Sequence, residues 1–262
     1  MNLYIITRGR VGNQLTLQHI PPSWYDRTYL VCPPEEVNLH TWPDILVADV
    51  PDYSKKVQWC LDYIADNEDG VGVIMDDDLW WDKRDPERWE KMVKVDHVEE
   101  VATMFEEIEA HLAERALVSV HPRMMGNLAP QPYKENGKVV CLQAVNINLF
   151  PGQVVPKVDY DPILADVHLN LHLLSRGVPN RLVTNFVMNW GPSQAPGGCD
   201  YRTLEMQHKA VTRIAEMYAP YAQAVTKRPK QAKWLGDERP DLRIQWKRLF
   251  EDAPKEKSDA TE

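Results

Sequence analysis

Three consecutive aspartates, Asp76, Asp77 and Asp78, end a glycine-punctuated apolar run in the stretch GVGVIMDDDLWW (70–81). Side chains alternate sides in extended chain, so Asp76 and Asp78 can converge while Asp77 points the opposite way. Two convergent carboxylates suit Mg²⁺ or Mn²⁺, hard cations that often share their oxygen ligands with a diphosphate. The alternative is a solvated acidic turn. We expect the cation site, because three aspartates directly after a buried strand are costly without a counter-charge.

The segment TRGRVGNQLT (7–16) combines arginines with glycines directly after an expected strand. Arg8 and Arg10 offer charge and planar donors to a phosphate or a base, and Gly9 lets the backbone approach a ligand closely. Gln14 can add a polar contact. The segment lacks the spacing of a Walker loop, and a turn with two solvated arginines fits it equally well.

The segment ILADVHLNLHLLSRG (163–177) has the period of a helix with one apolar stripe. Asp166 and Asn170 lie one turn apart, away from that stripe, so we expect both to face a cleft. There Asp166 can act as a general base or orient a sugar, whereas the structural alternative is an acid that complements the helix dipole. His168 and His172 lack the glutamate of an H-E-x-x-H motif, and we expect them to be packed.

The segment GPSQAPGGCDYRTLEMQHKA (191–210) combines a glycine pair with an arginine near the start of an expected helix. Gly197 and Gly198 allow a tight loop, and Arg202 makes that loop a candidate lid over a diphosphate. His208 lies one turn into the helix on an apolar side, where packing is the simpler interpretation.

These segments are expected to be positioned by an α/β sheet. Short apolar runs of strand length alternate with amphipathic helix patterns, which favours a mixed, mainly parallel sheet flanked by helices in a single domain. The expected strands are 3–7, 28–32, 45–49, 71–75, 116–120, 139–150 and 180–190, and the expected helices are 53–67, 97–115, 162–176 and 203–221. We assign 1–226 to this domain, 227–250 to a basic segment on or beside it, and 251–262 to a disordered tail.

The composition is that of a globular protein, with 44% hydrophobic and 26% charged residues among 262. A formal net charge of −9 argues against attachment to nucleic acid by bulk charge and leaves room for a local basic patch. The four cysteines are scattered without C-x-x-C spacing, as is typical of reduced thiols. No signal peptide or membrane-spanning stretch is recognisable, so we expect a cytoplasmic protein.

Together these segments resemble the GT-A (Rossmann-like) class of nucleotide-sugar glycosyltransferases, and most of all the phage-encoded, TET-associated type that glycosylates 5-hydroxymethylpyrimidines in DNA. The matching stretches span residues 3–250. They are YIITRGRVGNQLTL, VIMDDDL as the DxD signature, DVHLNLHLLSRGVPNR in place of an acidic helix motif, GGCDYRTLE and DLRIQWKRL. The helix motif usually carries Glu-Asp, and here Ala165 precedes Asp166.

The resemblance implies a GT-A fold and a role for each candidate residue. Asp76 and Asp78 would bind Mn²⁺ or Mg²⁺, with the late histidine His208 as a further metal ligand. Asp166 would be the catalytic carboxylate. The residues implied to bind the donor, a nucleotide-sugar that we expect to be UDP-linked, are Arg8, Gly9, Arg10, Gln14, Asp76, Asp77 and Arg202. The enzyme would act in the cytoplasm of an infected bacterial host.

Recognition of a DNA acceptor would need concentrated positive charge and a way to hold a flipped base. The basic segment supplies the charge with Lys227, Arg228, Lys230, Lys233, Arg239, Arg243, Lys247 and Arg248. Trp80, Trp81 or Trp234 can stack on the base, although we expect at least one of the first two to be packed in the core.

Three alternatives stay open at this level. The acceptor can be a protein, a lipid or a polysaccharide. The chain can be a phosphohydrolase with an aspartate nucleophile, although DDDLW lacks the Thr or Val expected two residues after the second aspartate. It can also be a non-catalytic nucleic-acid-binding protein, in which the loss of Asp78 would leave function intact.

Overall fold

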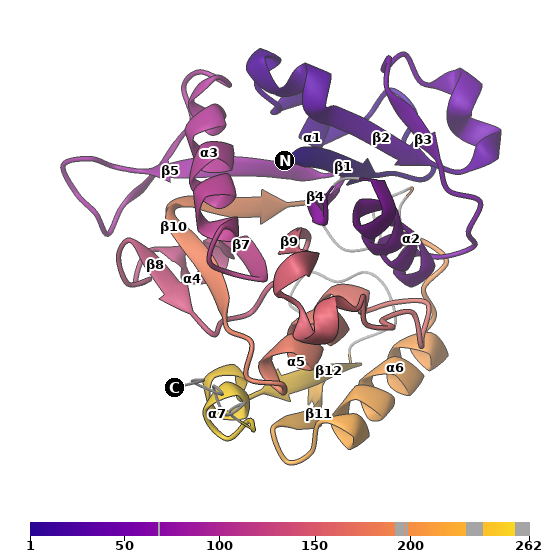
Figure 1. Ribbon diagram of the computed structural model, residues 1–262, viewed down its shortest axis with the longest axis vertical. Helices are drawn as coiled ribbons and strands as arrows, with labels where there is room; N and C mark the ends of the chain where they lie inside the picture. Colours follow the sequence, from indigo (N-terminus) through magenta and orange to yellow (C-terminus); the bar gives the residue numbers. More distant parts are fainter. Residues whose placement is uncertain (68, 192–196, 198, 229–237, 255–262) are drawn as a thin grey trace, which may run out of the picture.

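The computed structural model describes residues 1–67, 69–191, 197, 199–228 and 238–254. These residues form a single α/β domain in which helices flank a large mixed sheet (Figure 1). The sheet has ten strands in the order β3-β2-β1-β4-β9-β7-β10-β5-β6, with β8 paired to β10. None of the helices in the described residues is long and apolar enough to span a membrane.

One half of the sheet is parallel and closely matches the expected strands. It consists of β1 (Asn2–Ile6), β2 (Thr28–Cys32), β3 (Ile45–Val47) and β4 (Val71–Asp76). Helix α2 (Tyr53–Asn67) connects β3 to β4 and packs on this half, as its apolar spacing predicts. Gly72 permits the close packing, because a Cβ there would lie 2.8 Å from Cδ1 of Ile64 and 2.9 Å from Cε2 of Tyr4.

The other half of the sheet is largely antiparallel, so the expectation of a mainly parallel sheet is wrong. Among the described residues the large sheet has four parallel and five antiparallel pairings. The strands of this half are β5 (Leu79–Arg84), β6 (Met92–Lys94), β7 (Leu117–Pro122), β8 (Tyr133–Glu135), β9 (Leu142–Asn146) and β10 (Asn180–Trp190). The apolar runs gave no direction, because a strand covered on both faces is apolar whether its neighbours are parallel or antiparallel.

Two buried clusters fill the two faces of the sheet. One lies under α3 (Glu100–Leu112) and under two short helices near the N-terminus. These are α1 (Leu15–Gln18) and the 3₁₀ helix η1 (Pro22–Arg27). The other lies under α2 and α5 (Ala165–Leu174). The shorter elements are α4 (Arg123–Gly126) and the 3₁₀ helices η2 (Pro34–Leu39), η3 (Ile147–Leu149) and η4 (Pro151–Gln153).

Helix α5 differs from its expected amphipathic form, because it is covered on nearly every side. Nine of its ten residues are buried, with α2 packed on one side and the C-terminal elements on the other. Asn170 is fully buried rather than facing a cleft, and its side chain bonds to Gly137 and Asn180. His168 is packed as expected, with its ring between those of Tyr160 and Tyr218.

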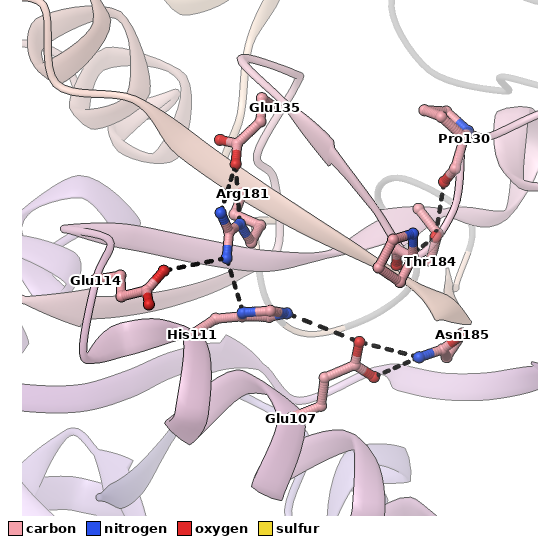
Figure 2. A network of polar contacts seen from close by, with 9 residues as sticks. Glu107, His111, Glu114, Pro130, Glu135, Arg181, Thr184 and Asn185 are labelled. Atoms are coloured by element: carbon pink, nitrogen blue, oxygen red, sulfur yellow. Dashed lines mark hydrogen bonds and ion pairs between the residues drawn. The ribbon is translucent and has the colours of Figure 1, made fainter.

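A polar network fastens β8 and α3 to β10 (Figure 2). The guanidinium of Arg181 donates to Oε1 of Glu135 at 2.8 and 2.9 Å and to Nδ1 of His111 at 2.9 Å. Asn185 donates to both carboxylate oxygens of Glu107, at 2.9 and 3.0 Å. The network therefore stabilises the antiparallel half of the sheet. It lies away from the edge at which the three aspartates gather.

The C-terminal region contains α6 (Leu204–Met217), a hairpin of β11 (Ala222–Lys227) and β12 (Arg239–Ile244), and α7 (Trp246–Glu251), which gather at the lower end of Figure 1. Helix α7 reaches into the start of the expected tail 251–262, of which 255–262 lie outside the described residues.

The basic segment is mostly neutralised by its own acidic neighbours. Lys230, Lys233 and Trp234 lie outside the described residues. Five of the six described basic residues form ion pairs, which are Lys227–Asp241, Arg228–Glu238, Arg239–Asp241, Lys247–Glu251 and Arg248–Asp252. The described part of this segment therefore offers less free positive charge to a phosphate backbone than its composition implies.

Candidate active site

The winding of the sheet reverses between β1 and β4. From β1 the chain runs outward to β2 and β3, and α2 then returns it to β4 on the other side of β1. Because β1 and β4 are parallel, with Ile6 opposite Asp76, the segments that follow them meet at one edge. Ligands of α/β sheets bind in the crevice at such a switch point. The three aspartates and the arginine–glycine segment 7–16 both lie there.

Thr16 holds the three-aspartate turn in one conformation. Its hydroxyl donates to the carbonyl oxygen of Asp76 at 2.7 Å and accepts from the backbone N–H of Leu79 at 2.8 Å. Its own N–H donates to the carbonyl oxygen of Asp77 at 3.0 Å. Thr16 is fully buried, so these bonds are shielded from water. From the sequence, Thr16 could be expected to add a polar contact, but its role in holding the aspartate turn could not be predicted.

Arg10 lies between Asp77 and Asp78. Its guanidinium is 2.6 Å from Oδ1 of Asp77 and 3.1 Å from Oδ2 of Asp78. The other oxygen of Asp77 accepts from the hydroxyl of Thr7 at 2.6 Å. Burial raises the pKa of Asp77 to about 6, although Arg10 and Thr7 act in the opposite direction. Asp77 therefore anchors Arg10, while Asp78 faces both Arg10 and the neighbouring carboxyl of Asp76.

Cys141 connects the carboxyl groups of Asp76 and Asp166. Its carbonyl accepts from the N–H of Asp76 at 2.9 Å. Its backbone N–H lies close enough to Asp166, and its thiol close enough to the Asp76 carboxyl, to lower the pKa of each acid. Cys141 has φ of +61°, a left-handed conformation that turns both of its backbone groups toward the two acids. No motif in the sequence indicates a role for Cys141 at this site.

Burial and mutual repulsion disfavour the ionised forms of these acids. Burial first, and then the charges of Asp78 and Asp166, raise the pKa of Asp76 well above its usual range. Burial also raises the pKa of Asp166, against the lowering effects of the Val167 N–H and of the charges on Lys138 and Arg202. The cluster thus concentrates negative charge that a proton or a cation can offset.

Tyr53, the first residue of α2, is a further member of the site that the motifs missed. Burial, followed by the charges of Asp166 and Asp76, raises its pKa well above the usual range. Its backbone N–H donates to the hydroxyl of Tyr201 at 2.7 Å, and that hydroxyl donates to the carbonyl of Pro162 at 3.0 Å. In the sequence, only the position of Tyr53 at the start of an expected helix near the carboxyl edge of the sheet could have indicated that it belongs to the site.

The remaining residues of the segment 7–16 are held by the protein itself. The backbone N–H of Gly9, with φ of +68°, donates to Oε1 of Glu36 at 2.7 Å. Gln14 is buried, and its amide lies 3.2 Å from Nδ1 of His40. The guanidinium of Arg8 bonds to the carbonyl of Pro51. Arg8, Gly9 and Gln14 are therefore each held by a contact to another part of the chain.

Of the glycine loop after β10, Gly197 is described, and it lies against the segment 7–16. A Cβ on Gly197 would lie 2.5 Å from Cγ of Arg10 and 2.8 Å from the carbonyl oxygen of Gly9. Gly198 lies outside the described residues. Arg202 follows the loop and lies close enough to Asp166 to lower its pKa. Gly197 therefore adjoins the arginine–glycine segment, and Arg202 adjoins Asp166.

His208 is not brought to the aspartates. It lies on the exposed face of α6, in a surface hollow that it shares with Leu204, Glu205 and Thr212. Among the described residues, no group of three or more His, Cys, Asp or Glu is arranged to hold a metal ion. The assignment of His208 as a metal ligand therefore has no support in the geometry.

Comparisons with known proteins leave the geometry as the guide to function: no protein-family description, no curated protein and no solved structure matches this chain.

Proposed function

We propose that this protein is a divalent-cation-dependent glycosyltransferase that moves a sugar from a nucleotide-sugar donor to a hydroxymethylated pyrimidine base in DNA. One observation carries the proposal. Asp76, Asp78 and Asp166, from two separate parts of the chain, gather at the switch point of the sheet beside Arg10. This arrangement supports the proposal, because the two carboxylates would hold a cation, the guanidinium would bind a phosphate, and Asp166 would accept a proton at one edge of the sheet.

The residues present fit a cation that shares its ligands with a substrate. Mg²⁺ and similar ions are bound through one or two carboxylates together with substrate phosphates rather than by a cage made only of protein. A complete three-residue metal group is therefore not required, and Asp76 and Asp78 would hold the ion. When bound, the cation neutralises charge on the departing nucleoside diphosphate. Burial, and then the negative charges of Asp78 and Asp166, raise the pKa of Asp76, and a bound cation would offset those charges.

The other roles in the proposed reaction fall to Arg10, Gly9 and Asp166. Arg10 is oriented by Asp77 toward the crevice and can bind a donor phosphate, and the positive φ of Gly9 brings backbone close to it. Asp166 is buried, and its raised pKa suits a carboxylate that takes a proton from an acceptor hydroxyl near neutral pH. In a retaining reaction the same carboxylate would position the sugar.

The acceptor is supported by the sequence resemblance rather than by the described part of the basic segment. A basic surface made of ion-paired residues binds phosphates weakly, so contacts near the crevice must contribute to DNA binding. A protein, lipid or polysaccharide acceptor is the alternative outcome of the same assay.

The test is sugar transfer measured with duplex DNA that contains hydroxymethylcytosine, with unmodified DNA, and without DNA. We expect transfer only to the hydroxymethylated DNA and only with Mn²⁺ or Mg²⁺. Asp78→Asn should lower turnover by about two orders of magnitude or more, the usual cost of removing one group that stabilises transition-state charge.

The matched control is Asp96→Asn, which removes an exposed carboxylate that pairs with Lys83 far from the crevice. It should leave turnover unchanged. Sugar transfer at equal rates without DNA would overturn the acceptor. Release of phosphate without sugar transfer would favour a phosphohydrolase, and full function in Asp78→Asn would favour a nucleic-acid-binding protein without catalysis.

A further inference from the structure

The two adjacent tryptophans on β5 have different environments. Trp81 is 2% exposed and packs edge-to-face against Phe105 of α3, with ring centroids 5.9 Å apart. Because side chains alternate along a strand, Trp80 points to the opposite face of the sheet, the face that α2 and α5 cover farther along. Trp80 is partly exposed and packs against neither buried cluster.

Among the described residues, Trp80 has no ring contact and no hydrogen bond that would explain a large aromatic side chain at this place. Four of the other described tryptophans, Trp24, Trp42, Trp59 and Trp81, stack or pack against aromatic neighbours, and Trp190 and Trp246 pack against a core cluster. Trp89 lies under the guanidinium of Arg84. A large, partly exposed apolar ring without a packing role is a common feature of binding surfaces.

Polar groups beside Trp80 are held in fixed orientations. Asn189 lies directly opposite Trp80 across the β5–β10 pairing. Oδ2 of Asp82 accepts from the Asn189 amide at 3.2 Å and from Nε of Arg123 at 3.3 Å. Since a carboxylate must face the amide nitrogen, the carbonyl oxygen of Asn189 is left to accept a bond from a ligand. Arg123 also donates to Asn127, and its side chain is 37% exposed.

This surface is continuous with the candidate active site. Trp80 follows Asp78 by two residues, and the backbone N–H of Gly191, just after Asn189 and Trp190, donates to the carbonyl oxygen of Asp78 at 3.3 Å. The aromatic ring, the amide and the guanidinium therefore lie along the β5–β10 pairing, next to the end at which Gly191 bonds to Asp78.

We propose that Trp80 is the platform on which the acceptor's heteroaromatic base stacks. The carbonyl of Asn189 accepts from an exocyclic amino group of that base, and Arg123 binds a phosphate of the same strand. This inference rests on the proposed function and names the residues that select its acceptor. Stacking on an aromatic side chain suits a base removed from a duplex, and the guanidinium favours a phosphorylated acceptor over a neutral sugar.

The test separates acceptor binding from donor binding. Steady-state kinetics with an oligonucleotide that contains 5-hydroxymethylcytosine should show that Trp80→Ala raises the acceptor KM about tenfold or more, the usual loss when one base loses its stacking partner. The donor KM should be unchanged, and so should the thermal shift produced by nucleoside diphosphate with Mn²⁺. Trp80→Phe, which keeps a flat ring, should recover most of the acceptor affinity.

Two further variants complete the design. Trp59→Ala removes a tryptophan that stacks on Tyr63 of α2, and it should leave the acceptor KM unchanged. Asn189→Leu should reduce the preference for hydroxymethylcytosine over hydroxymethyluracil, because only the cytosine ring carries the amino group.

The inference is overturned if Trp80→Ala leaves the acceptor KM unchanged, or if it raises donor and acceptor KM equally. It is also overturned if wild-type protein transfers sugar to an oligosaccharide and to no base. A wild-type protein that shows no Mn²⁺-dependent nucleotide binding would instead refute the proposed function itself, so the two failures are distinguishable.

Discussion

Replacement of Asn170 by alanine tests whether α5 is a buried structural helix or one face of a cleft. The Asn170 amide donates to the carbonyl of Gly137 at 3.0 Å, and its oxygen accepts from Nδ2 of Asn180 at 2.5 Å. Asn180 also bonds both backbone groups of Gly137, at 2.9 Å each. Asn170, Asn180 and Gly137 therefore bond to one another, and these bonds hold the segment that leads to Cys141 against α5.

The expected loss of stability follows from the hydrogen bonds that the substitution removes and from the amide group that it leaves unpaired. Asn170→Ala removes two buried hydrogen bonds, worth about 1 kcal/mol each, and leaves one N–H of the Asn180 amide without a partner, at a further cost of about 1 kcal/mol or more. We therefore expect the free energy of unfolding to fall by roughly 3 kcal/mol. For a chain of this length that lowers Tm by roughly 6 °C.

The assay is urea unfolding followed by circular dichroism, together with the thermal midpoint. Asn67→Ala is the matched control, because Asn67 makes one exposed bond to the carbonyl of Tyr63 and its loss should cost less than about 0.5 kcal/mol. Unfolding of Asn170→Ala at the wild-type midpoint, combined with loss of nucleotide binding, would refute the packing of α5 and restore Asn170 to a cleft.

Two further predictions concern the turn and the network in Figure 2. Thr16→Val keeps the shape of the side chain but leaves backbone groups of Asp76 and Leu79 unpaired, so it should cost about 2 kcal/mol or more in unfolding experiments and weaken Mn²⁺–nucleotide binding, while Thr16→Ser should retain both. Burial and the charge of Arg181 lower the pKa of His111, whose neutral ring accepts a bond from Arg181; Glu107, Glu114, Glu135 and Arg115 are the other charged groups around it. Because the folded pKa lies below the unfolded one, this contribution to stability is present above about pH 6.5 and lost as pH falls through the folded pKa. His111→Gln should flatten that part of the dependence of Tm on pH, and an unchanged slope would contradict the assignment.

The local elements were largely predictable from the sequence. The apolar spacing of 53–67 and the continuous run at 71–75 gave α2 and β4 nearly to the residue, since both patterns report burial by neighbours that are themselves regular. The position of Asp76 at a carboxyl edge of the sheet followed from the order of the strands, whereas the pairing of Arg10 with Asp77 and Asp78 did not.

Other features depend on contacts between distant segments, which no local pattern reports. On a helical wheel Asn170 lies on the polar side of α5, but in the structure it is buried against Gly137 and Asn180, which come from other segments of the chain. Cys141 lies between the two acids with a left-handed backbone, a conformation that no local pattern indicates. Basic residues of the C-terminal hairpin form ion pairs with nearby acidic residues, as Lys227 does with Asp241, and their charge is therefore largely neutralised.

The central claim is that Asp76 and Asp78 bind a divalent cation together with a nucleoside diphosphate. Calorimetric titration of UDP and the other nucleoside diphosphates into wild-type protein, with and without Mn²⁺, tests it most directly. The proposed site predicts saturable binding of one nucleotide that requires Mn²⁺, is lost in Asp78→Asn and is unchanged in Asp96→Asn. Binding of equal strength without Mn²⁺, or unaltered binding in Asp78→Asn, would contradict it.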